Sequence, residues 1–295
     1  MNKIKTKKLL ISLLAITLIY SCQKKLDTNF NSDISLFTKY ISSYSSGIVA
    51  ANSDIRVQLA VNKSDWKPNQ ELDDDLFDIS PSVSGKVVAL SSNTIAFVPK
   101  EKLKSNTIYQ VTLHLKELVN TPKELEDFKF TIKTIQQDFI VNTLDLQSYN
   151  KDLYYLNGTL KTADEANFED VQKIIEASQG FTDLKIKFDK TASTKTEFKF
   201  VIDSIQRLDD DSEIEIKWDG DCIDVDNENS VKYLIPGKKN FKVLKIEIGD
   251  ENNQSLLINF SDELKQDQDF KGLIAIQNTQ NLKFATQGNV LKVFF

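Results

Sequence analysis

Residues 53–61, SDIRVQLAV, decide the fold class, because a large apolar side chain stands at every second position from Ile55 to Val61. Ile55, Val57, Leu59 and Val61 would share one face of an extended chain, which is typical of a strand with one side in a core. The same period recurs in NTIAFVP (93–99), YQVTLHL (109–115) and FKFTIKT (128–134). Clusters of Asp, Ser, Asn, Gly and Pro separate these segments and indicate turns. Residues 37–136 are therefore predicted to form a β-sandwich.

The middle of the chain, residues 137–240, combines strand-like segments with one change of period. The strand-like segments are FIVNTLDL (139–146), DLYYLNGTLKT (152–162), LKIKF (184–188), EFKFVIDSI (197–205) and EIEIKW (213–218). Thr162 and Glu165 have the spacing of a capping box, and Gly180 suits a helix end. Between them Val171, Ile174, Ile175 and Ser178 recur at helical spacing. We expect a second β-sandwich that contains a short helix at about residues 164–179.

The last part of the chain, residues 241–295, repeats the pattern of the first. SLLINF (255–260) and DFKGLIAIQNTQNLKFATQGNVLKVFF (269–295) follow the same order of features as DIRVQL (54–59) and DLFDISPSVSGKVVALSSNTIAFVP (75–99). The later copy lacks the strands that complete the first one. We therefore expect an incomplete second domain after a junction at IPGKKNFKVL (235–244), and further C-terminal domains of the same polypeptide.

The first 21 residues have the features of a lipoprotein signal peptide. Four lysines within residues 1–8 precede an apolar stretch at 9–20, which is shorter than the roughly 20 residues that span a bilayer. LIYSC (18–22) resembles the lipobox of bacterial lipoproteins, although Tyr20 is bulkier than usual. This resemblance implies cleavage after Ser21 and attachment of diacylglyceryl and acyl chains to Cys22, a stable membrane anchor. The alternative is an ordinary signal peptide with an incidental cysteine.

Residues 22–36 are polar and are predicted to be a flexible tether. Gln23 follows the cysteine where an Asp would indicate retention at the inner membrane, so an outer-membrane location in the cell envelope is favoured. The sequence leaves open whether the protein faces the periplasm or the outside.

Charge and cysteine content exclude several classes of function. Removal of residues 1–21 takes away four of the 37 basic residues and none of the 43 acidic ones, which leaves a net charge of about −10. Such a chain is a poor ligand for nucleic acid and would be repelled by anionic headgroups, so the lipid must hold it to the membrane. Cys222 would be the only cysteine of the folded part, without a disulfide partner, and we expect it to be buried and inert.

The acidic segment WDGDCIDVDNENS (218–230) is the best metal candidate, because calcium prefers carboxylate oxygens on a loop. Its acidic residues are Asp219, Asp221, Asp224, Asp226 and Glu228. A calcium-binding EF-hand loop that began at Asp224 would place Asn229 at the glycine position and Ile235 at the final glutamate. One that began at Asp219 would place Ile223 at a ligand position. A solvated turn is the better interpretation, and we expect no metal or other cofactor. Asp73–Asp75 and Asp209–Asp211 are likewise predicted to be exposed turns.

Isolated residues complete the set of candidates. His114 has no second histidine nearby, so neither a zinc site nor a catalytic triad is indicated, and we expect a surface histidine. Trp66 and Trp218 could stack on sugars, but each is isolated and packing is the more usual role. No phosphate-binding loop or Gly-x-Ser-x-Gly motif occurs, and we expect that the chain is not an enzyme.

Several phrases together resemble the start of bacterial alpha-2-macroglobulin-family lipoproteins. These are YISSYSSGIVAANSDIRVQL (40–59), LFDISPSVSGKV (76–87), NTIAFVPKEKLKSNTIYQVTL (93–113), WDGDCIDVDNENS (218–230) and YLIPGKKNFKVL (233–244). The resemblance implies a mostly β chain of tandem bacterial immunoglobulin-like and macroglobulin-like β-sandwiches. The family traps proteases: a bait segment is cut, and a Cys-x-x-Gln thioester then acylates the attacker. Ile223, Asp224 and Val225 follow Cys222, so that thioester is absent.

The resemblance implies the membrane-anchoring, spacing part of a protease-trapping lipoprotein, with proteases as targets of the whole. An adhesion or glycan-binding lipoprotein built of immunoglobulin-like modules is the alternative from another class. A β-sandwich hydrolase is a third, for which the sequence shows no convergent acid–base pair.

Overall fold

The computed structural model describes residues 30–249, 255–277 and 279–295 and divides into two compact units. Of these residues, unit 1 contains 30–47, 55–98 and 109–132, and unit 2 contains 48–54, 99–108 and 133–295. Both units consist mostly of β-strands, which confirms the predicted fold class. Ser21, Cys22 and the first part of the tether lie outside the described residues. No helix in the described part of the chain is long and apolar enough to cross a membrane.

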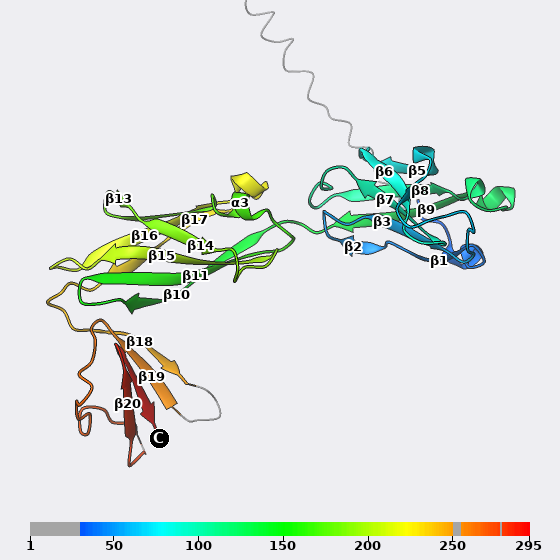
Figure 1. Ribbon diagram of the computed structural model, residues 1–295. Coiled ribbons are helices and arrows are strands. Elements are labelled where there is room, and N and C mark those ends of the chain that lie inside the picture. Colours follow the sequence, from blue (N-terminus) through cyan, green and yellow to red (C-terminus); the bar gives the residue numbers. More distant parts are fainter. Residues whose placement is uncertain (1–29, 250–254, 278) are drawn as a thin grey trace, which may run out of the picture. The chain divides into compact units, whose positions relative to one another are not determined.

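Unit 1 is built on two sheets (Figure 1). The first has the order β1 (Ile41–Tyr44), β3 (Ile55–Leu59), β7 (Thr94–Pro99), β6 (Gly85–Ala89) and β4 (Gln70–Glu71); the second has β2 (Gly47–Val49), β9 (Asp127–Thr134), β8 (Ile108–His114) and β5 (Phe77–Ser80). The short helix α2 (Ile34–Phe37) precedes β1, and 3-10 turns lie at Asp74–Leu76, Leu115–Glu117 and Lys123–Leu125.

The core of unit 1 follows the alternation in the sequence. Ile55, Val57 and Leu59 are fully buried, and Val57 of β3 lies opposite Ile95 of β7. Val111 and Leu113 of β8 and Phe128, Phe130 and Ile132 of β9 are buried from the other sheet. Val61 departs from the prediction: it is 46% exposed, because β3 ends at Leu59.

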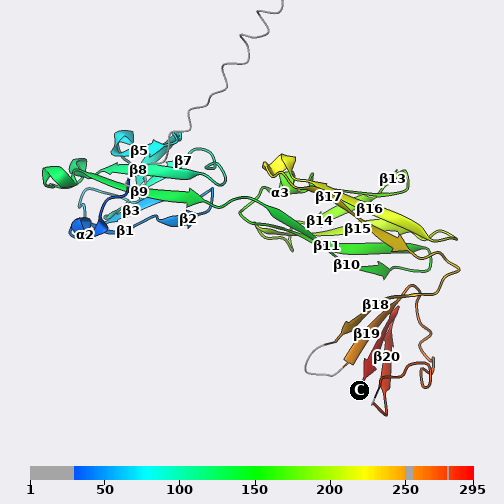
Figure 2. The same cartoon turned by 180° about the vertical axis from the view of Figure 1, so that it is seen from behind.

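The middle of unit 2 also contains two four-stranded sheets (Figure 2). One has the order β10 (Phe139–Ser148), β11 (Leu153–Thr162), β15 (Glu197–Gln206) and β14 (Lys185–Asp189); the other has β13 (Thr182–Asp183), β12 (Ile175–Gln179), β16 (Ser212–Asp219) and β17 (Glu228–Ile235). Residues of both sheets, among them Leu156, Phe200 and Ile216, form one buried cluster. Gly158 lies opposite Phe200 in β11 and β15, where a side chain at residue 158 would collide with the Phe200 ring.

The predicted helix at residues 164–179 is wrong in extent. The helix α3 spans only Phe168–Val171, capped by Asn167, whose side chain accepts a hydrogen bond from Glu169 N. Ile175 instead begins β12, which buries Ile175 and Ala177 against β16, and Gly180 adopts φ 62° between β12 and β13. The segment carries two periods: Val171 and Ile174 suit a helix, whereas Ile175 and Ala177 suit a strand. The β-branched pair Ile174–Ile175 favours the strand.

The C-terminal sheet confirms the internal repeat. Its order is β18 (Val243–Ile248), β19 (Ser255–Phe260), β21 (Val290–Phe294) and β20 (Lys283–Gln287), which matches β1, β3, β7 and β6 in unit 1. Even an irregularity recurs: the register shifts between Val243 and Lys245 as it does between Ile41 and Ser43. The sheet has a small core of its own, with Ile258, Phe270, Leu291 and Val293. It belongs to unit 2, so the predicted domain boundaries at 136 and 240 stay predictions.

Candidate functional site

The acidic segment does not assemble a metal site. Asp219 ends β16, Asp221 opens a 3-10 turn at Asp221–Ile223, and Asp224 follows with φ 57°. Asp219 Oδ1 accepts a hydrogen bond from Asp221 N at 2.9 Å, which is a local turn contact. The candidate carboxylates fall into two different pockets: Asp219, Asp221 and Glu228 line one, and Asp224 and Asp226 line another. Across the described residues no group of three or more His, Cys, Asp or Glu side chains is placed to hold a metal ion.

Cys222 is exposed, so the prediction of a buried cysteine is wrong. The 3-10 turn that follows Gly220 directs Val225 into the core instead. The Cys222 thiol donates a hydrogen bond to Asp170 O at 3.3 Å. Partial burial raises the pKa of the Cys222 thiol, and a protonated thiol is a poor nucleophile.

The two tryptophans differ in their surroundings. Trp66 is 8% exposed and packs in unit 1, which confirms the packing role. Trp218 is half-buried against the core of the middle sheets and lines a surface pocket with Cys222 and Asp219.

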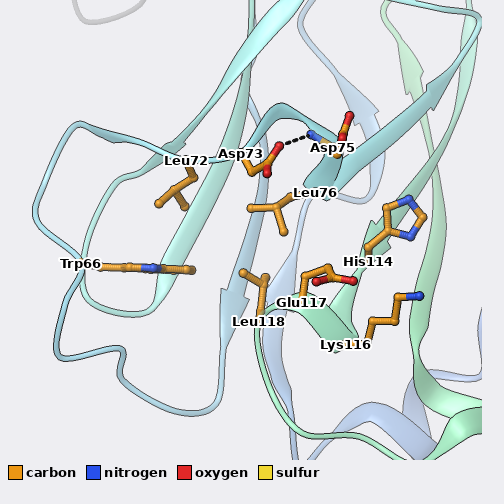
Figure 3. Close-up of a pocket in the computed structure, with 9 residues that line it drawn as sticks. All are labelled: Trp66, Leu72, Asp73, Asp75, Leu76, His114, Lys116, Glu117 and Leu118. Atoms are coloured by element: carbon orange, nitrogen blue, oxygen red, sulfur yellow. Dashed lines mark hydrogen bonds between the residues drawn. The ribbon is translucent and has the colours of Figure 1, made fainter.

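A surface pocket of about 560 Å³ lies in unit 1 around the end of β8. Figure 3 shows Trp66 and Leu72 on one side of it and His114, Lys116 and Glu117 on the other. The dashed line in the figure is the hydrogen bond from Asp75 N to Asp73 Oδ1, 3.1 Å long, with which Asp73 caps a 3-10 turn. Asp73–Asp75 are exposed, as predicted. The pocket therefore joins an apolar wall to a charged rim.

His114, at the rim, is held between two carboxylates that the sequence did not indicate. Its Nδ1 lies 2.8 Å from Asp127 Oδ1 and its Nε2 lies 3.1 Å from Asp78 Oδ2. Strands β5 and β9 flank β8 in the sheet and supply Asp78 and Asp127. The side chain is 27% exposed, so the predicted surface histidine is in fact half-buried. A general base needs a ring nitrogen free to face a substrate. Because carboxylates occupy both nitrogens, this arrangement suits a structural link better than proton transfer.

The same geometry sets the direction of the His114 pKa. Partial burial lowers it, but the hydrogen bonds and negative charges of Asp127 and Asp78 outweigh burial and raise the pKa above the ordinary 6.5. The neighbouring rim also carries Lys116, with a positive charge, and Glu117, with a negative one.

We predict that unit 1 loses stability as pH rises from about 6.5 through the raised pKa. The folded state binds the proton on His114 more tightly than the unfolded state, so this contribution is fully present below the unfolded pKa and lost above the folded one. His114→Gln should abolish the dependence in that window, as measured by denaturant unfolding at a series of pH values. His114 is the only histidine of the chain, so its ring-proton NMR signal reports the pKa directly. A value at or below 6.5 would contradict the prediction.

An ion pair between a buried arginine and a half-buried aspartate joins the C-terminal sheet to the middle sheets within unit 2. The Arg207 side chain, only 1% exposed, forms a two-pronged ion pair with Asp262, whose longer arm is Nη2 to Oδ2 at 3.0 Å. Its Nε donates to Pro236 O at 3.0 Å and its Nη2 donates to Gly237 O at 2.9 Å. Of the 37 basic residues in the sequence two are arginines, Arg56 and Arg207, and the rest are lysines. Because arginine is the usual cation of buried ion pairs, its rarity here could have indicated a structural role for Arg207.

Tyr154 and Asp211 complete this junction. The Tyr154 ring lies 5.7 Å from the Arg207 guanidinium carbon, and its hydroxyl donates to Ser261 O. Burial raises the pKa of Tyr154 to about 12. Asp211, in an exposed turn as predicted, accepts hydrogen bonds from Gly237 N and Asn240 Nδ2 and pairs with Lys242. These contacts lower the Asp211 pKa and hold the segment between β17 and β18 in place.

A second polar cluster of unit 2 surrounds Asp164. This buried carboxylate accepts hydrogen bonds from Ala51 N at 2.7 Å and Glu165 N at 2.8 Å. Glu165 in turn pairs with Lys195 and accepts from Asn52 Nδ2 at 2.6 Å. The short segment at 48–54 is thus fastened to the loop that precedes α3. Thr162 and Glu165, the predicted capping box, serve this cluster and β11 rather than a helix.

No family model matches the chain, and neither does any curated protein. Among solved structures the chain is similar to the I9–I11 tandem from titin, with 9% identity over 86% of this chain and 88% of that one and a TM-score of 0.31. Domains 4 and 5 of the S-layer protein SbsC match with 12% identity, 66% and 97% coverage and a TM-score of 0.31. An L,D-transpeptidase from Mycobacterium tuberculosis H37Rv matches with 10% identity and a TM-score of 0.25. That match covers 51% of this chain and 59% of the transpeptidase. At these scores we base no argument on the likeness.

Proposed function

We propose that this chain is a lipid-anchored, non-catalytic scaffold of the bacterial cell envelope. The single observation that carries the proposal is LIYSC at 18–22, a lipobox-like stretch directly ahead of a polar tether and a series of β-sheets. Cys22 is the lipidated residue and Ser21 the last residue of the leader. The outer membrane is the proposed location.

The contacts between the sheets of unit 2 support a scaffold role. A spacer must resist bending, and the Arg207–Asp262 pair together with Leu244, packed on the core of the middle sheets, opposes motion at the β17–β18 junction. Both ring nitrogens of His114 lie against carboxylates, and the pKa of the Cys222 thiol is raised. Neither residue is therefore an activated base or nucleophile.

We further assign the scaffold to an alpha-2-macroglobulin-like protease-trapping lipoprotein. This finer assignment rests on the sequence phrases and on the order of modules behind the lipobox. Because Cys222 lacks a glutamine three residues later, the thioester would have to come from further domains of the same polypeptide. Proteases are the proposed targets of the whole, with this part acting as its membrane-proximal stalk.

The test uses the chain purified from bacterial membranes. Mass spectrometry of the N-terminal peptide should show that it begins at Cys22 and carries acyl chains, and a free amino terminus elsewhere would overturn the anchor. The same preparation should show no saturable binding on a glycan array, since Trp66 is 8% exposed and Trp218 is half-buried against the core of the middle sheets. Saturable glycan binding would favour the adhesion alternative instead.

A further inference from the structure

The C-terminal sheet ends in an apolar strand with little cover. β18 stands at one end of the strand order β18–β19–β21–β20. Its Ile246 and Ile248 are 58% and 81% exposed, although they lie opposite Ile258 and Leu256 on the face that carries the core of this sheet. An edge strand leaves a row of backbone N–H and C=O groups unpaired, which is a template for pairing with another strand.

The backbone of β18 offers its hydrogen-bonding groups at those same residues. Gly249 N donates to Ser255 O at 2.7 Å, so Gly249 and Ser255 form a hydrogen-bonded pair. Hydrogen-bonded and non-hydrogen-bonded pairs alternate along an antiparallel ladder. The N–H and C=O groups of Ile246 and Ile248 therefore point away from β19.

In β1, the strand of unit 1 that matches β18, the residue corresponding to Ile246 is covered by other side chains. By the shared register shift, Ile246 corresponds to Tyr44 of β1. The Tyr44 ring is covered by Phe128 and Phe130, whose ring centroids lie 5.0 and 5.2 Å away. Serines precede and follow Tyr44, whereas charged residues flank Ile246.

We propose that β18 pairs antiparallel with β18 of a second copy of this chain, about a two-fold axis through Ile246. The two Ile246 residues would then exchange both backbone hydrogen bonds, and each Lys245 would lie directly opposite Glu247 of the other copy. Lys245 and Glu247 already pair within each strand, with Nζ and Oε1 2.5 Å apart, so the four charges would alternate in sign around the axis. Those flanking positions form non-hydrogen-bonded pairs, in which cross-strand side chains are closest. In the competing register, centred on Glu247, two carboxylates would face each other, which is unfavourable.

This pairing is independent of the proposed scaffold role, but membrane attachment would strengthen it. Two or three backbone pairs make a weak contact in dilute solution. Chains confined to one membrane meet at a higher effective concentration, which favours the paired state.

Disulfide trapping tests the register. Ile246→Cys in a Cys222→Ser background places two thiols across the axis at a Cα separation of about 5.5 Å, within disulfide range. Mild oxidation of the full chain in membranes should give a covalent dimer on a non-reducing gel. Glu247→Cys and Ser43→Cys, the latter in the matching strand β1, are controls for the other register and for random collision, and Cys222→Ser alone controls for Cys22. Equal or stronger cross-linking through either control position would overturn the proposal, as would a failure of Ile246→Cys to cross-link.

Exchanging the charges at Lys245 and Glu247 tests whether these residues pair across the two-fold axis. Lys245→Glu and Glu247→Lys should each weaken self-association about tenfold, because each puts like charges opposite one another, and the double exchange should restore it. Analytical ultracentrifugation of the chain in detergent measures the dissociation constants, and circular dichroism confirms that each variant is folded. A double exchange no tighter than the single variants would overturn the charge pairing. A chain that stays monomeric at all concentrations, in detergent and in membranes, would overturn the dimer itself.

Discussion

Replacing Cys22 with serine should release the chain from the membrane fraction. The sulfur of Cys22 is the proposed site of diacylglyceryl attachment, and serine offers no thiolate for that reaction. Each buried methylene contributes about 0.8 kcal/mol to membrane binding, so losing several acyl chains removes essentially all of the anchoring free energy. Without residues 1–21 the chain would carry a net charge of about −10, which gives it no electrostatic substitute on an anionic bilayer. Fractionation and immunoblotting should show at least about a tenfold shift to the soluble fraction.

The leader itself requires a second variant. An unprocessed precursor would keep the apolar stretch at 9–20 and could stay in the membrane through it. Replacing residues 1–21 with an ordinary cleaved leader, ahead of serine at position 22, removes that stretch. The matched control is the native chain, which keeps residues 1–21 and Cys22 within the lipobox-like stretch at 18–22. Membrane attachment of the serine form after leader removal would show that another part of the chain holds it.

The strands of both units were predictable because alternating apolar residues in the sequence become the buried face of a sheet. A two-residue period places Ile55, Val57 and Leu59 on one face, and a chain can bury such a face only by pairing it in a sheet. The helix prediction failed because the segment from Val171 to Ala177 fits both the helical and the strand period. Pairing with β16 then decided its conformation. Local pattern cannot reveal that partner, which lies about 40 residues away in the sequence.

The polar sites were unpredictable because their members, too, are far apart in the sequence. Asp78, 36 residues from His114, meets it only because β5 pairs with β8. Arg207 and Asp262 are 55 residues apart and follow strands of different sheets, β15 and β19. The sequence showed each of these residues as an isolated charge in a turn or a strand. Only the register of the strands makes them partners.

Arg207→Met should cause the largest loss of stability of any single change in the junction. The Arg207 side chain is 1% exposed, and its guanidinium forms the ion pair with Asp262 as well as hydrogen bonds to Pro236 O and Gly237 O. Methionine keeps much of the apolar stem but leaves Asp262 without its counter-ion and two carbonyls without a donor. Breaking a buried pair in this way costs about 3–5 kcal/mol. Denaturant unfolding, followed by circular dichroism, measures the loss.

A surface pair provides the matched control for this junction. Lys86 and Glu71 in unit 1 lie 2.9 Å apart, but both side chains are more than half exposed. Lys86→Met removes a cation as Arg207→Met does, yet solvent screening limits its effect to about 1 kcal/mol or less. Asp262→Asn should act with Arg207→Met non-additively, because each removes the same pair. Equal losses for Lys86→Met and Arg207→Met would mean that the junction stabilises the C-terminal sheet no more than an exposed ion pair does. Unit 2 would then owe its cohesion to apolar contacts such as that of Leu244.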